Sequence, residues 1–334
     1  MTLTCFGELL LRLTPPAMQL MAQATQLDLV VGGAEANVAA ALAALGHDVR
    51  FAGLVSDNRL GDRAVSALRS TGIETRFLAR APGRMGLYFM EAGAGLRPSA
   101  ITYDRAASAF AEAVPNAIDF GQALAGSALL HTGGITPALG PKGVALARAA
   151  QAAAKAAGVP ICFDGNYRAQ LWAAWNSNPA DILRELVADA SILIGNHRDI
   201  SLLLGRDFSG DGADRRRAAA EAAFAAFPQL QIIASTARHL VTSGHHRISA
   251  RIDARDQAYE TGAIDITAIV DRIGTGDAFA AGVLHQWLLH GDIRAMAESG
   301  LAMSALKHSI AGDMCLVTRA DLESFSADIG DVRR

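Results

Sequence analysis

Short apolar runs alternate with helical patterns along most of the chain. The strand-like runs are Leu3–Phe6, Val49–Val55, Ala128–His131, Pro160–Asp164, Ser191–Gly195 and Gln231–Ser235. Several are apolar on consecutive residues, as expected for strands that are covered on both faces. Alanine-rich helical stretches lie between them, at Ala34–Leu45, Gly61–Ser70, Pro141–Ala157 and Ala213–Phe227. The alternation predicts an α/β fold, a doubly wound and mostly parallel sheet flanked by helices.

Two segments interrupt this alternation. Residues 11–30 carry Pro15 and Pro16 and show no helical period, while residues 84–105 contain two strand-like runs around a glycine-rich bend. Both segments are typical of β-strands in a small sheet outside the main layer. Such a sheet is either a pair of exposed surface hairpins or a lid over a binding site.

Composition narrows the class of protein. The 334 residues are 51% hydrophobic and 19% charged, which indicates a globular chain with an ample core. The net charge of −3 and the lack of a long Lys/Arg run give no reason to expect nucleic acid or a membrane surface as partner. The densest basic spot, Arg215–Arg217, is typical of a solvated helix face. Without a secretory signal or a bilayer-spanning run, we expect a cytoplasmic protein.

The stretch 271–282 carries the strongest chemical signal. Gly274 and Gly276 flank Thr275 and allow a sharp turn that can approach a ligand closely. An apolar stripe at helical spacing follows, so the turn leads into a helix. A glycine turn at a helix N-terminus presents free N–H groups and the positive end of the helix dipole, which together favour an anion.

Asp277 lies on the first turn of this helix and has two interpretations. It is either a helix N-cap, a position that Asp fills well, or a general base beside an anion site. A lone Gly-x-Gly-Asp does not decide between them.

The whole stretch resembles the second signature of the ribokinase-like (PfkB) carbohydrate kinases. This resemblance implies that Gly274, Thr275 and Gly276 form an anion hole, that Asp277 is the catalytic base, and that ATP and Mg²⁺ are the cofactors. Residues 32–39 resemble the first signature of the family. There the resemblance implies contacts with the sugar from Gly32, Gly33, Ala34 and Asn37. It also implies that segments 11–30 and 84–105 form a lid, which often pairs between subunits and so predicts a homodimer or a higher homo-oligomer.

Three segments resemble the sugar-acid branch of the family, the 2-keto-3-deoxygluconate kinases. One is residues 164–168, at the end of a predicted strand, and the others lie in the lid segment 84–105. Arginines bind carboxylates in bidentate fashion, and tyrosines offer hydroxyls to a sugar. From the residues alone, Arg168 is equally an ordinary surface cation. The resemblance implies five substrate-binding residues: Tyr88, Tyr103, Arg105, Asn166 and Arg168.

The nucleotide side has weaker signals. Residues 196–199 resemble the family's Asn-x-x-Glu element, which helps to place Mg²⁺ and phosphates and includes Asn196. Asp199 stands where Glu is usual, and its shorter carboxylate suits Mg²⁺ held through water. Segments that flank ATP in the family are matched by two pairs of residues: Ser235 and Thr236, and Lys307 and His308. Without the family, Lys307 and His308 would be ordinary surface residues, and His245-His246 a pair in a loop.

The resemblance extends from Gly7 to about Thr318 and predicts one kinase domain over residues 1–334. It predicts ATP-dependent phosphorylation of a sugar acid at its terminal hydroxyl. A fructokinase or another neutral-sugar kinase is the alternative enzyme, and a non-catalytic sugar sensor is the alternative class. No Gly-x-Gly-x-x-Gly follows the first strand and no P-loop is present, which argues against nicotinamide dehydrogenases and P-loop enzymes.

Overall fold

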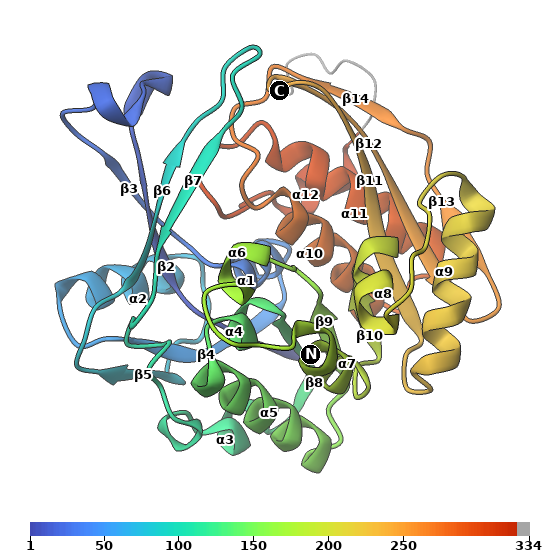
Figure 1. The fold of residues 1–334 in the computed structure, drawn as a ribbon, viewed down its shortest axis with the longest axis horizontal. Coiled ribbons are helices and arrows are strands. Elements are labelled where there is room, and N and C mark those ends of the chain that lie inside the picture. The colour runs from blue at the N-terminus through green and yellow to red at the C-terminus, as the bar shows by residue number, and fades with distance from the viewer. Residues whose placement is uncertain (326–334) are drawn as a thin grey trace.

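The computed structural model describes residues 1–325, and within them the main layer is a ten-stranded sheet (Figure 1). Its order is β13-β12-β11-β10-β9-β8-β1-β4-β5, with β14 also paired to β12. From β5 to β11 the neighbouring strands are parallel, whereas β12 pairs antiparallel with β11, β13 and β14. The strands are β1 (Thr2–Phe6), β4 (Asp48–Ser56), β5 (Leu78–Ala81), β8 (Ser127–Gly133), β9 (Ile161–Asp164), β10 (Ile192–Ile194), β11 (Ile232–Thr242), β12 (His245–Ala254), β13 (Ala258–Glu260) and β14 (Ile264–Thr267). The predicted fold class is confirmed.

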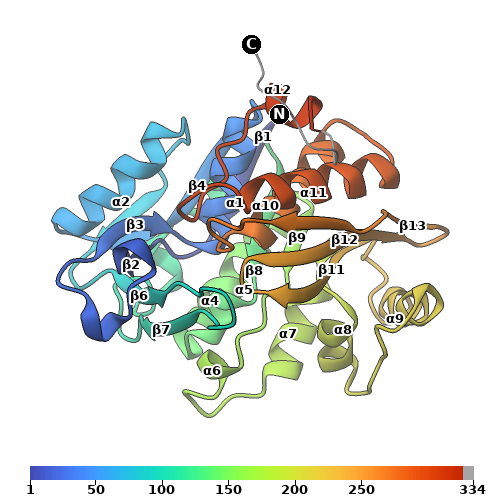
Figure 2. The same ribbon diagram turned by 90° about the horizontal axis from the view of Figure 1, so that it is seen from above.

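Helices cover both faces of this sheet (Figure 2). One face carries α1 (Ala34–Ala44), α2 (Arg59–Ser70), α10 (Thr275–Leu288) and α11 (Ile293–Lys307). The other carries α3 (Phe120–Leu124), α5 (Pro141–Ala156), α7 (Pro179–Val187), α8 (His197–Leu204) and α9 (Ala213–Ala226). Cys5 and Phe6, neighbours on β1, belong to the clusters on opposite faces, which explains why the central strands are apolar on consecutive residues. In the described part of the chain, no helix is both long and apolar enough to cross a membrane.

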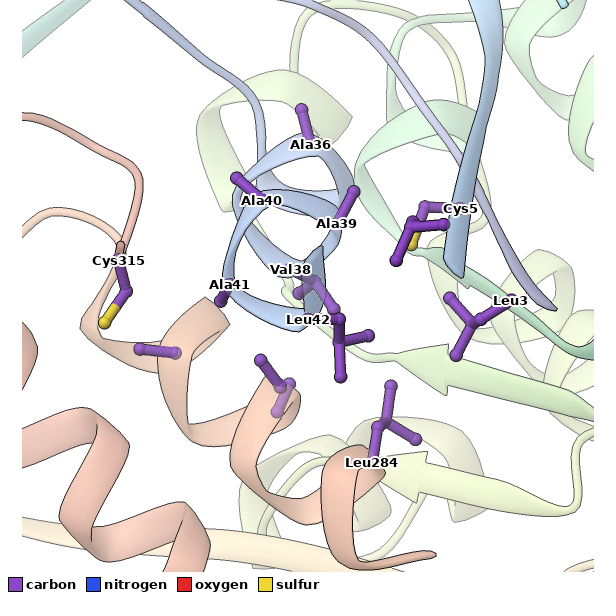
Figure 3. Close-up of a cluster of buried hydrophobic side chains, with 14 of the residues drawn as sticks. Leu3, Cys5, Ala36, Val38, Ala39, Ala40, Ala41, Leu42, Leu284 and Cys315 are labelled. Atoms are coloured by element: carbon purple, nitrogen blue, oxygen red, sulfur yellow. The ribbon is translucent and has the colours of Figure 1, made fainter. Parts of the chain in front are cut away.

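The packing of α1 against α10 determines where the two signature segments meet. Val38, Ala41 and Leu42 of α1 lie beside Leu284 of α10 and Leu3 of β1 (Figure 3). Alanine has a small side chain, so an alanine-rich helix can approach both the sheet and a neighbouring helix closely. The first turns of the two helices, which carry the two signature sequences, therefore lie next to each other.

A second, four-stranded sheet of order β3-β2-β6-β7 stands beside the main layer (Figure 1). Its strands are β2 (Leu10–Thr14), β3 (Asp28–Gly32), β6 (Gly86–Glu91) and β7 (Ala100–Asp104), so both predicted lid segments contribute to it. Leu10, Tyr88 and Met90 form a small buried cluster on this sheet, and Ile273 of the glycine turn packs against it. The bend between β6 and β7 also contacts the turn between β11 and β12, because Gly95 O accepts a hydrogen bond from Ser243 N at 3.1 Å. These contacts join the small sheet to the rest of the fold, so it is not a pair of free hairpins. We keep the name lid for this sheet, while its closing over a substrate and its pairing in a homodimer stay predictions.

The main sheet differs from the predicted elements in the region after Ser235. Strand β11 does not end there but continues to Thr242, and the chain returns as β12 from His245. The interpretation of His245-His246 as a loop pair is therefore wrong, since both residues open β12 and His246 is fully buried. The second half of β11 shows no clear alternation of apolar and polar residues. Its pairing with β12 stabilises it as a strand.

Candidate active site

The first turns of α1 and α10 form the floor of the site. Gly33 and Gly274 are the N-cap residues, with φ of +144° and +79°, a region in which glycine is favoured. A Cβ at Gly33 would lie 2.2 Å from Glu8 O, and one at Gly274 would lie 2.0 Å from Asp313 O. Gly276 is exposed instead, and a Cβ there would have no heavy atom of the described residues within 4 Å. The turn is thus closely packed from behind and open above Gly276, the arrangement that an anion needs.

Asp277 is the third residue of α10, and Gly274 occupies the N-cap position. The interpretation of Asp277 as a helix N-cap is therefore wrong. Its Oδ2 accepts a hydrogen bond from Asn37 Nδ2 of α1 at 2.7 Å, which joins the two signature segments. Burial raises the pKa of Asp277 to about 6, although the Asn37 hydrogen bond and the charge of Arg168 act in the opposite direction. A carboxylate with a pKa near neutrality is suited to accept a proton from a hydroxyl.

Two further buried acids lie near Asp277. Burial, together with the nearby charge of Asp277, raises the pKa of Glu35 to about 7. The pKa of Asp164, at the end of β9, is also raised well above its usual value by burial and by Asp277. Each of these acids disfavours the ionised form of its neighbours, so a cation bound nearby would lower their pKa values.

The two arginines predicted to bind the substrate differ in their surroundings. Arg105 is only 3% exposed, and its guanidinium forms an ion pair with Glu8, with Nε 3.0 Å from Oε2. Ser108 Oγ donates to the other oxygen of Glu8 at 2.6 Å. Arg168 is exposed and forms no ion pair within residues 1–325, and its positive charge lowers the pKa of Asp277. Arg168 is therefore the predicted arginine with a guanidinium still available for a ligand.

The polar residues predicted in the lid contact one another and Asp313. Tyr88 and Tyr103 are cross-strand partners on β6 and β7, with ring centroids 6.2 Å apart. The Tyr88 hydroxyl donates to Asp313 Oδ2, while Tyr103 is half-buried with the Arg105 guanidinium 6.0 Å from its ring centroid. Asn166, two residues before Arg168, has a left-handed φ of +37°, which Asn tolerates better than most residues.

Asn196 and Asp199, predicted to lie near the nucleotide, cap α8. The Asn196 side chain accepts from Arg198 N at 2.8 Å, and Asp199 Oδ2 accepts from Asn196 N at 2.8 Å. Burial raises the pKa of Asp199. Ser235 and Thr236 lie within β11, not after it, and β10 ends beside this part of β11 because Ile194 pairs with Ala234. Asn196, Ser235 and Thr236 are thus neighbours at one sheet edge, and the metal role of Asp199 stays a prediction.

Lys307 and His308 are buried, so their interpretation as ordinary surface residues is wrong. Lys307 Nζ donates to Ile310 O at 2.9 Å and lies 3.5 Å from Asp271 O. His308 O accepts from Val270 N at 2.9 Å. Both residues support the glycine turn from behind, and contact of either with ATP stays a prediction.

Sequence reasoning missed several charged residues around the turn: Glu8, Arg12, Asp271 and Asp313. All four have buried or nearly buried side chains, and each forms an ion pair within the described part of the chain. Arg12 follows the strand alternation Leu11-Arg12-Leu13, which by itself indicates an outward-facing cation. No local pattern could reveal its two carboxylate partners, because they lie more than 250 residues away.

Known proteins resemble this chain over nearly its whole length. A 2-dehydro-3-deoxygalactonokinase from Haloferax volcanii is 32% identical over 323 residues, which are 96% of this chain and 95% of that protein. The crystal structure of a 2-dehydro-3-deoxygluconokinase from Thermotoga maritima superposes with a TM-score of 0.92 at 35% identity and 97% coverage of both chains. A putative 2-keto-3-deoxygluconate kinase from Enterococcus faecalis superposes with a TM-score of 0.89 at 27% identity, covering 100% of this chain and 99% of the other.

Residues 2–315 match the model of the pfkB family carbohydrate kinases. That range includes both glycine turns, the lid strands and the carboxylates around Asp277. Together with the fold and the relatives, it confirms the resemblance noted in the sequence. The chain belongs to the pfkB family of carbohydrate kinases.

Proposed function

We propose that residues 1–334 act as one domain that transfers the γ-phosphoryl group of ATP to the terminal hydroxyl of 2-keto-3-deoxygluconate. The observation that carries this proposal is the exposed guanidinium of Arg168, which forms no ion pair within residues 1–325 and lies close enough to Asp277 to lower its pKa. A sugar acid bound there would place its carboxylate on Arg168 and its far hydroxyl toward Asp277. A neutral sugar offers this arginine no carboxylate.

Asp277 would take the proton from the substrate hydroxyl while that oxygen forms a bond to the γ-phosphorus. The bond between the γ-phosphorus and the β,γ-bridging oxygen breaks, and ADP leaves. Free N–H groups at the start of α10 would be available to the transferring phosphoryl group, because no side chain of residues 1–325 caps this helix. Asn37 holds the Asp277 carboxylate through its 2.7 Å hydrogen bond.

The nucleotide would lie beside Asn196, Ser235 and Thr236, at the edge where β10 ends along β11. Within residues 1–325 no group of three or more His, Cys, Asp or Glu side chains could hold a metal ion as a protein cage. Mg²⁺ usually binds through one or two carboxylates together with water and phosphates, so Asp199 fits an ion that arrives with ATP. When bound, Mg²⁺ would neutralise phosphate charge during transfer.

The 4-epimer of this acid, 2-keto-3-deoxygalactonate, is a second candidate substrate. The Haloferax relative is a 2-dehydro-3-deoxygalactonokinase, whereas the Thermotoga neighbour is a 2-dehydro-3-deoxygluconokinase. Both acids carry the same carboxylate, so the contribution of Arg168 does not discriminate between them.

A substrate panel tests the proposal directly. ADP release should be measured with ATP, Mg²⁺ and each of 2-keto-3-deoxygluconate, 2-keto-3-deoxygalactonate, fructose and ribose. We expect kcat/KM for a sugar acid to exceed that for fructose by at least about tenfold, since only the acid offers Arg168 a carboxylate for a charge-assisted pair and 1.4 kcal/mol is a factor of ten. Equal or better activity on fructose would replace the sugar-acid proposal with a fructokinase. No ADP release with any sugar would instead favour a non-catalytic sensor.

The pH dependence of the reaction should follow Asp277. The base acts only as a carboxylate, and its pKa in the free enzyme is about 6. We therefore expect kcat/KM to be level above pH 7 and to fall as the pH drops through 6, approaching tenfold per pH unit below it. Steady-state rates between pH 5 and pH 8.5 would measure this limb, with circular dichroism at each pH as the control for folding. A constant kcat/KM down to pH 5 would contradict the assignment.

A further inference from the structure

A buried guanidinium connects the lid to the glycine turn. Arg12 lies on lid strand β2 with a side chain only 5% exposed. Its Nη2 donates to Asp271 Oδ2 at 2.7 Å, and its Nε lies 3.2 Å from Asp313 Oδ1. Its Nη1 donates to Met90 Sδ of the lid at 3.4 Å. The same guanidinium thus contacts Asp271 and Asp313, two buried carboxylates that lie far apart in the sequence.

Each carboxylate in turn holds part of the site. Asp271 is the first residue of the signature stretch, and its Oδ1 accepts from Ile273 N at 2.9 Å. Its Oδ2 accepts from Gly312 N at 3.1 Å, which ties the turn to the loop before Asp313. The Asp313 carboxylate accepts a hydrogen bond from the Tyr88 hydroxyl, and the Asp313 backbone carbonyl packs directly behind Gly274. The position of the anion hole therefore depends on both acids, and both acids share Arg12.

We propose that Arg12 is a positioning residue, which fixes the glycine turn relative to the lid and so places the anion-hole N–H groups for phosphoryl transfer. Preorganised donors act only if they stand where charge develops, and a misplacement of about 1 Å can cost about 10²-fold in rate. Arg12 is not itself a substrate ligand, because its guanidinium is buried and already occupied by Asp271 and Asp313. This inference rests on the proposed phosphoryl transfer.

Three variants test the role of Arg12. Arg12→Met leaves two buried carboxylates without their cation, and Arg12→Lys keeps the charge but not the planar fork that reaches both. The double variant Arg12→Met/Asp271→Asn removes one charge of the pair and so favours folding if Arg12→Met alone is unstable. For each, kcat and both KM values should be measured on the folded fraction, together with thermal unfolding.

We expect Arg12→Met to lower kcat by about 10²-fold, with KM for ATP changed only a few-fold, and Arg12→Lys to recover part of that loss. The double variant should regain stability but not kcat, because the turn still lacks its tie to the lid. Arg50→Met is the matched control. Arg50 lies at the amino end of β4, the edge opposite the site, where it pairs with Glu74 at 3.1 Å and donates to Ala125 O at 2.7 Å. It should lose stability without losing kcat.

Recovery of kcat in the double variant would show that Arg12 only offsets charge, and an unchanged kcat in Arg12→Met would also overturn the proposal. Amide hydrogen exchange of residues 272–276 gives a readout independent of activity, and we expect faster exchange in Arg12→Met than in Arg50→Met. If the wild type phosphorylates no sugar, the proposed function fails while this exchange comparison still tests the tie between Arg12 and the turn. Equal exchange in the two variants would then overturn the tie itself.

Discussion

Asp277→Asn should lower kcat by about 10²–10⁴-fold and leave KM for the sugar acid within a few-fold of the wild type. The amide keeps the size of the side chain but cannot accept the proton of the attacking hydroxyl, and loss of a general base typically has this cost. The hydrogen bond from Asn37 Nδ2 can be replaced by one to the amide oxygen, so the geometry of the two helix starts should persist. Steady-state kinetics with saturating ATP and Mg²⁺ would measure both constants.

Asp62→Asn provides the matched control for this variant. Asp62 also lies in the first turn of a helix, α2, but its exposed side chain pairs with Arg80 at 2.9 Å. It should change kcat by less than twofold, since it removes only a carboxylate near a helix N-terminus. If Asp277→Asn retained wild-type kcat, Asp277 would not be the base, and the remaining pH limb would have to belong to another group.

Arg168→Ala should raise KM for 2-keto-3-deoxygluconate by at least about tenfold. A charge-assisted hydrogen bond contributes about 1.5–3 kcal/mol, and 1.4 kcal/mol corresponds to a factor of ten. Arg168→Lys should recover only part of the loss, because an ammonium cannot form two parallel bonds to a carboxylate. Substrate-saturation curves for the sugar acid and for fructose would separate a carboxylate effect from a general one.

Arg148→Ala is a suitable control, because Arg148 is half-exposed on α5 and pairs with Glu185 on the surface. Its KM values should match those of the wild type. An equal rise in KM for fructose and for the sugar acid in Arg168→Ala would show that Arg168 does not read the carboxylate. Arg105 is a poorer choice for this test, since its removal leaves Glu8 buried without a cation and would act through stability.

The sequence by itself determined the layered fold and the position of the chemistry along the chain. Consecutive apolar residues in Leu3–Phe6 and Pro160–Asp164 report burial on both faces, and that signal is local because strand residues alternate between faces. The glycine turn was also predictable from the sequence, because a sharp turn that approaches a ligand favours glycine. In the structure, the positive φ of Gly274 and the Asp313 carbonyl behind it exclude a side chain at that position. The resemblance to the family rested on the two glycine-rich stretches at 32–39 and 271–282, and the family match over residues 2–315 confirmed it.

Only the tertiary structure decided which charges remain available at the site. Arg105 and Arg168 are equivalent as sequence, yet Glu8 neutralises the first, and among residues 1–325 no carboxylate forms an ion pair with the second. Lys307 carries the same charge as a surface lysine but is fully buried against backbone carbonyls. The partner of a side chain is set by how distant elements pack, and the cost of burying an unpaired charge makes that partner essential. The ion pair between Arg12 and Asp271 joins residues 259 positions apart, and no local sequence pattern encodes such a pairing.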